Sequence, residues 1–328
     1  RRPERAPPVR ILQKPESMTL PVPAARGERL VRAAVLILLL EGCAKPPLSD
    51  NGVVGVFGTS GLAPGELSYP RAIAVLADNH VFVADKSGRI QRFAADGTFE
   101  LSWYMPEWKA GKPLGLTVHP DGRLFVADTH YSRVLIFDEQ GHELDRFGEN
   151  GAGPGQFLLV TDVAIDDQGF IYVAEYGGND RVSKFSPALG FVRLLADQPL
   201  AGLRLSRPAA LAIDRQQTLW VADACNHRIL HLSLEGELLG HFGHVGQGPG
   251  ELRWPYDICV CADGSLLVSE FGNNRLQWFS AQGESLRTWG EGGRAVGQLY
   301  SPFGVCEAPN GLVYVLDAMN NRVQMIRM

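Results

Sequence analysis

The sequence predicts an all-β fold, a six-bladed β-propeller of four-stranded antiparallel blades, and two observations support it. A tripeptide of the type Val-Ala-Asp recurs six times, and its acidic residues lie 43, 47, 48, 47 and 47 residues apart. The residue that opens each unit is an independent landmark, and it repeats with the same spacings. Because the two registers agree, we interpret the chain as six copies of one unit, each long enough for the four short strands of a propeller blade.

Each unit contains the strand and turn patterns of a blade. An alternating apolar run, a turn such as Asp121-Gly122 and a second apolar run that ends in the acidic residue predict a β-hairpin. An arginine four to six residues later opens a third run, and a fourth run follows another turn. The opening residues are Pro70, Pro113, Val160, Pro208, Pro255 and Pro302, the acids are Asp85, Asp128, Glu175, Asp223, Glu270 and Asp317, and the arginines are Arg89, Arg133, Arg181, Arg228, Arg275 and Arg322.

The two ends of the repeat region are expected to meet in one blade. The sixth unit ends at Met328 after its third strand, so we expect residues 53–57 to supply the outer strand and close the ring. Closure removes the free edge strands through which open sheets aggregate. The repeated acid and arginine are interpreted as a structural pair, because both occur in every blade. Each inner strand has a small or acidic residue in one column, which fits crowding near the axis: Ala72, Gly115, Asp162, Ala210, Asp257 and Gly304.

The composition is that of a turn-rich globular protein, with 45% hydrophobic residues, 20% charged residues and 37 glycines. The formal net charge is -5, and residues 43–328 contain 23 basic and 32 acidic residues. Affinity for nucleic acid depends on neutralising phosphates with basic side chains. An acidic body therefore argues against a nucleic-acid partner.

Residues 1–42 are interpreted as upstream residues followed by a signal peptide. The apolar run 33–40 follows three arginines and is too short to span a bilayer, which needs about 20 apolar residues. Its length and basic flank are typical of a signal peptide. The chain does not begin with Met, so we expect Met18 to be the true start. The alternative is a frayed apolar helix with an incidental cysteine at position 43.

The segment Leu40-Glu41-Gly42-Cys43 resembles a bacterial lipobox, in which the cysteine is lipidated and becomes the mature N-terminus. Glu41 departs from that pattern, in which a small or aliphatic residue is usual. The resemblance implies a lipid anchor on Cys43 and a tether over residues 43–50. It also implies a place in the bacterial cell envelope, on the periplasmic side of the outer membrane or at the cell surface.

Several segments resemble the signature of the NHL-repeat family of β-propellers. They are Phe147-Gly148 through Gly153-Pro154-Gly155-Gln156-Phe157, then Val221-Ala222-Asp223, and then Asn226-His227-Arg228-Ile229. The resemblance covers roughly residues 51–328 and, with the N-terminal segment, suggests a bacterial lipoprotein member of that family. It implies a fold and no particular activity, because one fold hosts many functions. His227 matches the repeat signature and is therefore expected to be structural.

The loops after the acidic tripeptide and the loops that join blades are expected on one face, which is the predicted binding face. The loop after the first blade lacks the glycine-rich pattern and contains Trp103, Tyr104 and Trp108, which predict a ligand or partner contact. The alternative is that Trp103 and Trp108 only cover the edge of the blade. If a contact exists, neighbouring loops extend it through Tyr131, Tyr176, Asn179, Phe271, Asn273 and Met319.

Weaker candidates exist for chemistry at the channel mouth. Asp162 and Asp257 are the two acids in the inner column, and with His130 they raise the hypothesis of a catalytic or metal site. Such acids more often accept hydrogen bonds from the backbone of neighbouring loops. No cofactor is expected, although Ca or Zn stays an alternative, since some propeller lyases that look related bind zinc through histidine. Cys259 and Cys306 fall in one column of adjacent inner strands, where a disulfide or two buried free thiols are both compatible with the sequence.

The leading hypothesis is a membrane-tethered, extracytoplasmic scaffold that binds a protein, peptide or glycan on the predicted face. The alternative is a metal-dependent hydrolase or lyase, lactonase-like or peptidyl-amidating-lyase-like, whose site lies at the channel mouth. Whether the protein is an enzyme is therefore open at the level of sequence, with binding the preferred interpretation. The membrane is expected to be contacted through the lipid anchor only.

Overall fold

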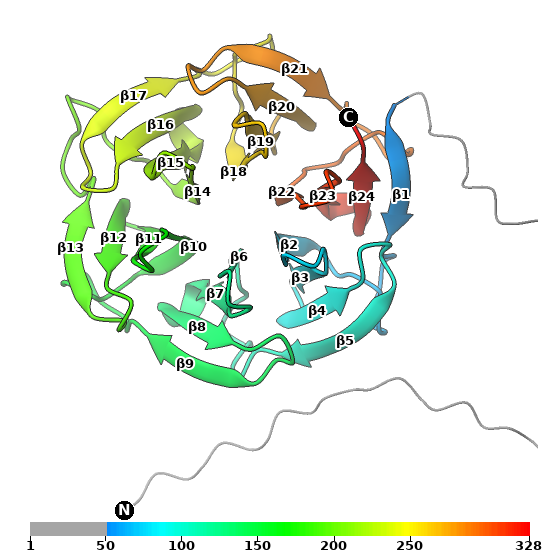
Figure 1. Cartoon of the computed structure of the whole chain (residues 1–328), viewed down its shortest axis with the longest axis horizontal. Coiled ribbons are helices and arrows are strands. Elements are labelled where there is room, and N and C mark those ends of the chain that lie inside the picture. The colour runs from blue at the N-terminus through cyan, green and yellow to red at the C-terminus, as the bar shows by residue number, and fades with distance from the viewer. Residues whose placement is uncertain (1–50) are drawn as a thin grey trace, which may run out of the picture.

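Residues 51–328 are described by a computed structural model, and they form a ring of six four-stranded sheets around a central axis (Figure 1). Neighbouring strands of a blade pair in antiparallel fashion, as in the third blade. The predicted all-β, six-bladed fold is confirmed. The signal peptide, the tether and Cys43 lie outside the described residues.

The first strand of each blade lies nearest the axis, and the fourth lies at the rim. Blade 1 contains β2 (Pro70–Val75), β3 (Val81–Asp85), β4 (Arg89–Phe93) and β5 (Phe99–Tyr104). Blade 2 contains β6 (Gly115–Val118), β7 (Leu124–Asp128), β8 (Arg133–Phe137) and β9 (Glu143–Phe147). Blade 3 contains β10 (Leu159–Ile165), β11 (Ile171–Tyr176), β12 (Arg181–Phe185) and β13 (Phe191–Leu195). Blade 4 contains β14 (Pro208–Ile213), β15 (Thr218–Asp223), β16 (Arg228–Ser233) and β17 (Leu238–Phe242). Blade 5 contains β18 (Pro255–Val260), β19 (Leu266–Glu270), β20 (Arg275–Phe279) and β21 (Ser285–Trp289). Blade 6 contains β22 (Val305–Glu307), β23 (Val313–Asp317), β24 (Arg322–Ile326) and β1 (Val53–Phe57).

The ring closes where the two ends of the described chain pair. Strand β1 runs antiparallel to β24, with Val53 opposite Ile326 and Phe57 opposite Val323, and Figure 1 shows the two strands side by side. Strand β1 supplies the outer strand of blade 6, as the sequence predicts. Closure leaves each blade covered by a neighbour on both sides, and only the short edges of the outer strands remain at the rim.

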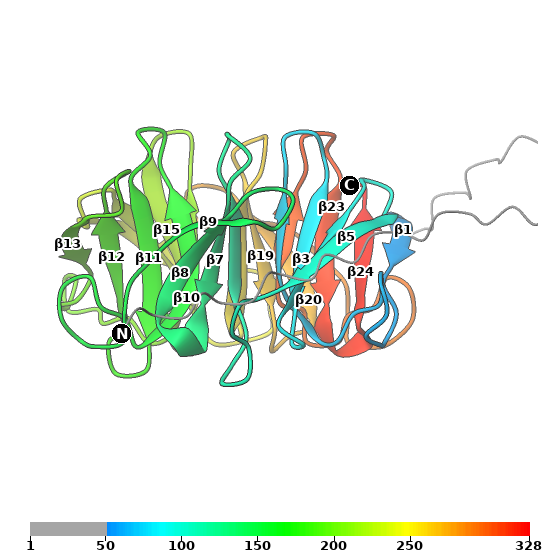
Figure 2. The same cartoon turned by 90° about the horizontal axis from the view of Figure 1, so that it is seen from below.

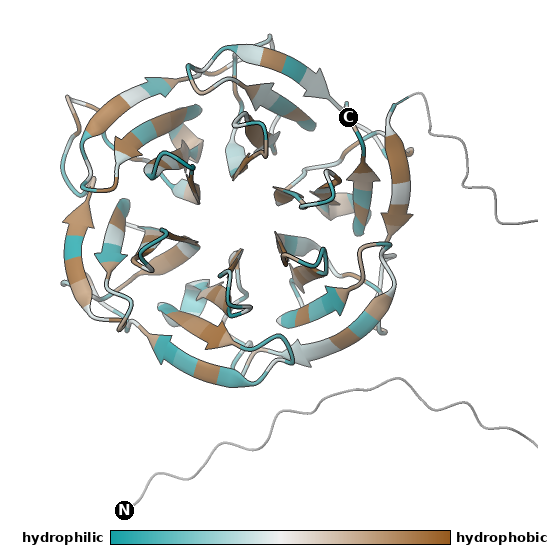
Figure 3. Ribbon diagram, in the orientation of Figure 1, coloured by the Kyte–Doolittle hydropathy of each residue, from teal (hydrophilic) through white to brown (hydrophobic). Residues whose placement is uncertain are grey.

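The hydrophobic core consists of six buried clusters, one at each interface between neighbouring blades. The outer strands mix hydrophilic and hydrophobic residues (Figure 3), as expected where one side of a strand faces water. Near the axis the packing is tight. A Cβ added at Gly115 would lie 2.5 Å from Asp162 Oδ1, and one at Gly304 would lie 2.9 Å from Ile73 Cγ2. This confirms the predicted crowding of the inner strands.

The predicted pairing of acid and arginine is present in every blade. The six salt bridges have N–O distances between 2.6 and 2.9 Å, and all six acids are buried. Most of the arginines also donate to carbonyls of the preceding inter-blade loop, as Arg275 does to Gly248 O at 2.9 Å. Each pair therefore fastens the inter-blade loop to its blade by charge-assisted hydrogen bonds.

His227 has the structural role that its place in the repeat predicts. It adopts a left-handed backbone conformation with φ of 56°, and its Nδ1 accepts a hydrogen bond from Trp254 N at 3.0 Å. Asn274 and Asn321 do the same in the next two blades, accepting from Ser301 N and Tyr69 N. In each case the side chain fixes the chain as it enters the following blade.

Loops gather at the two ends of the ring (Figure 2). The inter-blade loops and the loops that follow β3, β7, β11, β15, β19 and β23 lie at one end, which we call the loop face. The turns that follow the six inner strands lie at the opposite end. Every inner strand begins at the loop face, so the residues around each opening position surround one mouth of the central channel.

Candidate functional site

The central channel encloses about 320 Å³ and is lined by the inner strands of all six blades. Its wall is mainly small and aliphatic, with Ala72, Leu116, Leu211 and Ile258 among the lining residues. A cavity of this size falls at the lower end of the range of small-molecule sites. Charged and aromatic side chains are concentrated at the mouth on the loop face. Two acids lie below them in the channel.

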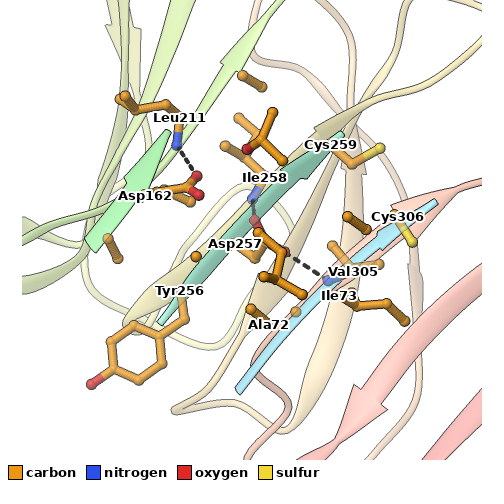
Figure 4. Close-up of a pocket in the computed structure, with 18 of the residues that line it drawn as sticks. Ala72, Ile73, Asp162, Leu211, Tyr256, Asp257, Ile258, Cys259, Val305 and Cys306 are labelled. Atoms are coloured by element: carbon orange, nitrogen blue, oxygen red, sulfur yellow. Dashed lines mark hydrogen bonds between the residues drawn. The ribbon is translucent and has the colours of Figure 1, made fainter. Parts of the chain in front are cut away.

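Asp162 and Asp257 bridge the inner strands of neighbouring blades (Figure 4). Asp162 Oδ2 accepts a hydrogen bond from Leu211 N at 2.9 Å, and Asp257 Oδ2 accepts one from Val305 N at 2.7 Å. Asp257 Oδ1 also accepts from Ile258 N at 2.8 Å. Both carboxyl groups thus accept hydrogen bonds from the backbone. This structural role is the alternative that the sequence left open beside a metal or catalytic site.

Burial changes the protonation of both acids. Loss of hydration raises the pKa of Asp257 to about 7. Burial raises the pKa of Asp162 well above its usual value, and the nearby Asp257 adds to the shift because two like charges repel. Near neutral pH this pair therefore favours a protonated form.

The other predicted metal candidate is remote from these acids. His130 lies in the short 3-10 turn 129–131 after β7 and is exposed, where it packs against Gly111 of the loop that joins blades 1 and 2. Within residues 51–328, no group of three or more His, Cys, Asp or Glu side chains is placed to hold a metal ion. The structure therefore does not bring His130 together with Asp162 and Asp257.

Two thiols lie farther along the channel. Cys259 and Cys306 are on the adjacent inner strands β18 and β22, at the end of the site away from Tyr256 in Figure 4. Both are free cysteines in the structure. Burial raises the pKa of both thiols, so they favour the neutral, unreactive form.

A continuous arc of aromatic rings borders the mouth along blades 5, 6 and 1. Successive ring centroids are 4.7 to 6.4 Å apart, and most of the rings are half-buried. The rings follow the order Trp254, Phe271, Tyr256, Phe303 and Tyr69.

Two arginines extend this arc across the mouth. The Arg71 guanidinium lies over the rings of Tyr69 and Phe303, at 4.4 and 4.7 Å from their centroids. Arg207 lies over Tyr176 at 4.8 Å and over Tyr256 at 5.4 Å. Cation–π contacts of this kind stabilise a charge that has lost part of its hydration. The mouth is therefore both aromatic and positively charged, although the body of the protein is acidic.

The predicted aromatic loop after blade 1 divides into a buried and an exposed part. Trp103 is 1% exposed and packs between Phe82 and Phe137. It therefore covers the edge of the blade, which was the alternative to a ligand contact. Tyr104 and Trp108 are exposed, with ring centroids 6.2 Å apart. Tyr104 is the last residue of β5 and Trp108 lies in the loop that follows, so the two rings are a separate feature from the channel mouth.

Contacts with blade 2 hold this loop in place. Glu107 forms a salt bridge with Arg133 at 2.8 Å, and Lys112 lies over the Trp108 ring at 4.7 Å. The Tyr131 hydroxyl accepts a hydrogen bond from Ala110 N at 3.0 Å. Tyr131 therefore borders the loop, and its ring also lies under the Arg133 guanidinium.

The remaining predicted contacts are distributed around the loop face. Tyr176 and Phe271 belong to the channel mouth. Asn273 donates to Gly246 O and Glu270 Oε2, so its amide braces the loop of its own blade. Asn179 is half-buried in the loop after β11, and Met319 is exposed in the loop after β23.

Sequence reasoning missed Arg71, Arg207, Tyr69, Tyr256 and Phe303. A signal for them exists in the repeat itself. They occupy the positions directly before or after the opening residue of a unit, where other blades have residues such as Leu114, Ala209 and Ser301. A comparison of these two columns across blades would have found the departures.

Comparison with known families supports the repeat assignment. The NHL repeat profile matches residues 205–232 and 252–279, and a profile described as a 6-bladed beta-propeller matches residues 112–182. The chain contains NHL repeats. Among curated relatives, it is 27% identical over 205 residues to NHL repeat-containing protein 3 of Mus musculus, covering 54% of this chain and 56% of that protein. It is also 27% identical over 133 residues to Protein brain tumor of Drosophila melanogaster, covering 40% of this chain and 12% of that protein.

Solved structures share the fold at low sequence identity. A Bacteroides thetaiotaomicron protein of unknown function has a TM-score of 0.65 at 17% identity, over 83% of this chain and 75% of that one. A gluconolactonase from Xanthomonas campestris has a TM-score of 0.61 at 15% identity, over 80% and 87% of the two chains. A streptogramin B lyase has a TM-score of 0.60 at 14% identity, over 82% and 95%. At these identities the likeness concerns the propeller fold alone.

No helix within residues 51–328 has the length and apolar character needed to cross a membrane.

Proposed function

We propose that this NHL-repeat propeller is a binding scaffold, and that it binds a protein, peptide or glycan partner over the channel mouth on its loop face. The observation that carries this proposal is the arc of half-buried rings from Trp254 to Tyr69. Large aromatic side chains contribute much buried area at a small entropy cost, which is why they dominate binding surfaces.

The arc departs from the repeat, and this separates it from the structural groups of the blades. The acid–arginine pairs recur in all six blades because each blade needs them. The rings are concentrated in three adjacent blades, and Trp254 is 37% exposed. A feature that propeller architecture does not require is better explained by contact with a partner.

The alternative function, a metal-dependent hydrolase or lyase, depends on Asp162 and Asp257. Their hydrogen bonds to the backbone of neighbouring strands and their raised pKa values suit neutral acids that join blades. His130 is too far out on the loop face to complete a set of ligands with them. The geometry thus favours binding over hydrolysis or elimination.

Membrane attachment is a part of the same proposal. Lipidation of Cys43 would hold the propeller at the bacterial envelope through the tether 43–50, as the lipobox-like sequence suggests. The test is metabolic labelling with a fatty acid in a bacterial host that expresses the full chain. We expect label and membrane fractionation for the natural protein and loss of both in Cys43→Ser. Equal fractionation of the two proteins would contradict the anchor.

Binding at the mouth is tested by capture of envelope components on the natural protein, Trp254→Ala and Arg215→Gln. Arg215 is exposed in the turn between β14 and β15, at the end opposite the loop face, so its variant is the control. We expect a component that the natural protein and Arg215→Gln retain and that Trp254→Ala loses. Identical recovery on all three proteins would remove the channel mouth as the binding surface.

A further inference from the structure

The two arginines at the mouth are half-buried and have no acidic partner in the described part of the chain. Arg71 is the second residue of β2, and Arg207 directly precedes β14, so they come from blades 1 and 4 on opposite sides of the ring (Figure 1). Neither guanidinium forms a salt bridge or a hydrogen bond with any group in residues 51–328, and Arg71 Nε is buried without an acceptor. The six arginines that follow the acidic tripeptides are all paired.

The unpaired charges are costly in the protein alone. Burial lowers the pKa of Arg71, and the positive charge of Arg207 lowers it further. A buried charge without a partner is among the most unfavourable arrangements in a folded protein. The aromatic rings offset a part of this cost, because each guanidinium stacks on two of them.

Each guanidinium lies over two aromatic rings, and its N–H edge has no acceptor within residues 51–328. That edge is the group that recognises carboxylates and phosphates, with two parallel hydrogen bonds. An anion between Arg71 and Arg207 would relieve the repulsion between two like charges and accept hydrogen bonds from their Nη groups. The arrangement therefore suits a ligand with a negatively charged oxygen group on the channel axis.

The channel below the arginines suits an uncharged body. Its wall includes Ala72, Leu116, Leu211 and Ile258, and its volume of about 320 Å³ is sufficient for a small organic molecule. Burial raises the pKa of both Asp162 and Asp257, which reduces their negative charge near neutral pH and with it their repulsion toward an anion. The aliphatic side chains of this mixed wall can contact the uncharged body of a ligand whose anionic group lies at the cationic mouth.

We propose that Arg71 and Arg207 form a binding site for the carboxylate or phosphate group of a small organic molecule whose apolar body enters the central channel. This goes beyond the scaffold function, because the site needs no macromolecular partner. The aromatic rings under the two arginines pack against both guanidinium groups. The same chemistry is shared by carboxylates and phosphates, and the choice between them is made by experiment.

The test uses benzoate, phenyl phosphate and the uncharged benzamide as probes, titrated into the purified protein by isothermal titration calorimetry. Arg71→Gln and Arg207→Gln each remove one guanidinium. Arg215→Gln is the matched control, since it removes the same charge from blade 4 at the opposite end of the ring. Thermal unfolding of each variant shows whether it is folded. If Arg71→Gln does not fold, Arg207→Gln still tests the site, because Arg207 is half-exposed.

We expect benzoate or phenyl phosphate to bind the natural protein and Arg215→Gln equally. The association constant should fall about tenfold or more in either mouth variant, because each loses hydrogen bonds to a charged group. Binding of one probe and not the other identifies the anionic group. Three results would overturn the proposal: no binding of either anion, undiminished binding in both mouth variants, or benzamide binding as tightly as benzoate. Partner capture on Trp254→Ala is a separate measurement, so either proposal can fail while the other holds.

Discussion

Asp128 and Arg133 form a salt bridge of 2.9 Å, yet Asp128 Oδ1 is buried and accepts no hydrogen bond from the described residues. In the other five blades the corresponding acid accepts a backbone N–H from the preceding loop, as Asp85 does from Ser68 N. In blade 2, no backbone N–H of the loop after blade 1 donates to this acid. Blade 2 is the one place where the repeated acid is incompletely satisfied.

Asp128→Asn is therefore expected to change how stability depends on pH. Burial raises the pKa of Asp128 to about 6 from a usual value of 3.8. A folded-state pKa above the unfolded value means that the folded protein binds more protons between these limits, so the contribution of Asp128 to stability is lost as the pH rises from about 4 to 6. The shift corresponds to about 3 kcal/mol at most.

The measurement is the free energy of unfolding of the natural protein and of Asp128→Asn in urea between pH 4 and pH 7. The variant should gain stability relative to the natural protein as the pH rises through this window. Other titrating groups affect both proteins equally, so the difference between their free energies of unfolding reports on position 128. A difference between the two proteins that stays constant with pH would show that Asp128 ionises normally.

Gly115→Ala is expected to destabilise the propeller. The added Cβ would lie 2.5 Å from Asp162 Oδ1 and 2.6 Å from Thr161 O, and the second contact is with backbone that cannot rotate away. Overpacking of this kind typically costs about 1–3 kcal/mol. Gly240→Ala in the outer strand β17 is the control, because nothing lies within 4 Å of its added Cβ. Equal unfolding midpoints for the two variants would contradict close packing at the axis.

The fold could be predicted from the sequence because every blade repeats the same local pattern of apolar runs, turns, acid and arginine. The acidic residues at the ends of β3, β7, β11, β15, β19 and β23 gave the register, and residues 53–57 could be assigned to the last blade because one strand was missing there. These inferences need only the order of residues along the chain.

The channel mouth could not be assembled in the same way. Arg71 and Arg207 are 136 positions apart in the sequence, and their approach depends on the ring bringing blades 1 and 4 face to face. The burial of Trp103 was equally hidden, because the sequence does not show which side of β5 faces the neighbouring blade. The acids Asp162 and Asp257 were recognised by position, but the backbone groups that they bind were visible only in three dimensions.

Asp257→Ala is expected to weaken the contact between blades 5 and 6. It leaves Val305 N without its acceptor at 2.7 Å, and an unsatisfied buried N–H costs about 1–3 kcal/mol. Asp257→Asn keeps an oxygen at this place and should retain most of the stability at pH 7, where Asp257 is about half protonated. Urea unfolding of the two variants distinguishes these cases. If Asn is as damaging as Ala, the carboxyl group has a role other than accepting this hydrogen bond.

Trp103 and Trp108 differ in burial, and their removal is expected to have different consequences. Trp103→Ala deletes a side chain that is 1% exposed and packed against Phe82, Phe137 and Gly141, so it should cost about 3–5 kcal/mol. Trp108 is 41% exposed and contacts mainly Tyr104, Lys112 and Gly88, so Trp108→Ala should cost less than about 1 kcal/mol. Chemical denaturation compares the two variants directly. A loss of similar size for both would mean that the loop after blade 1 is as much a part of the core as the strands it joins, and Trp108 would then have no free surface to offer a partner.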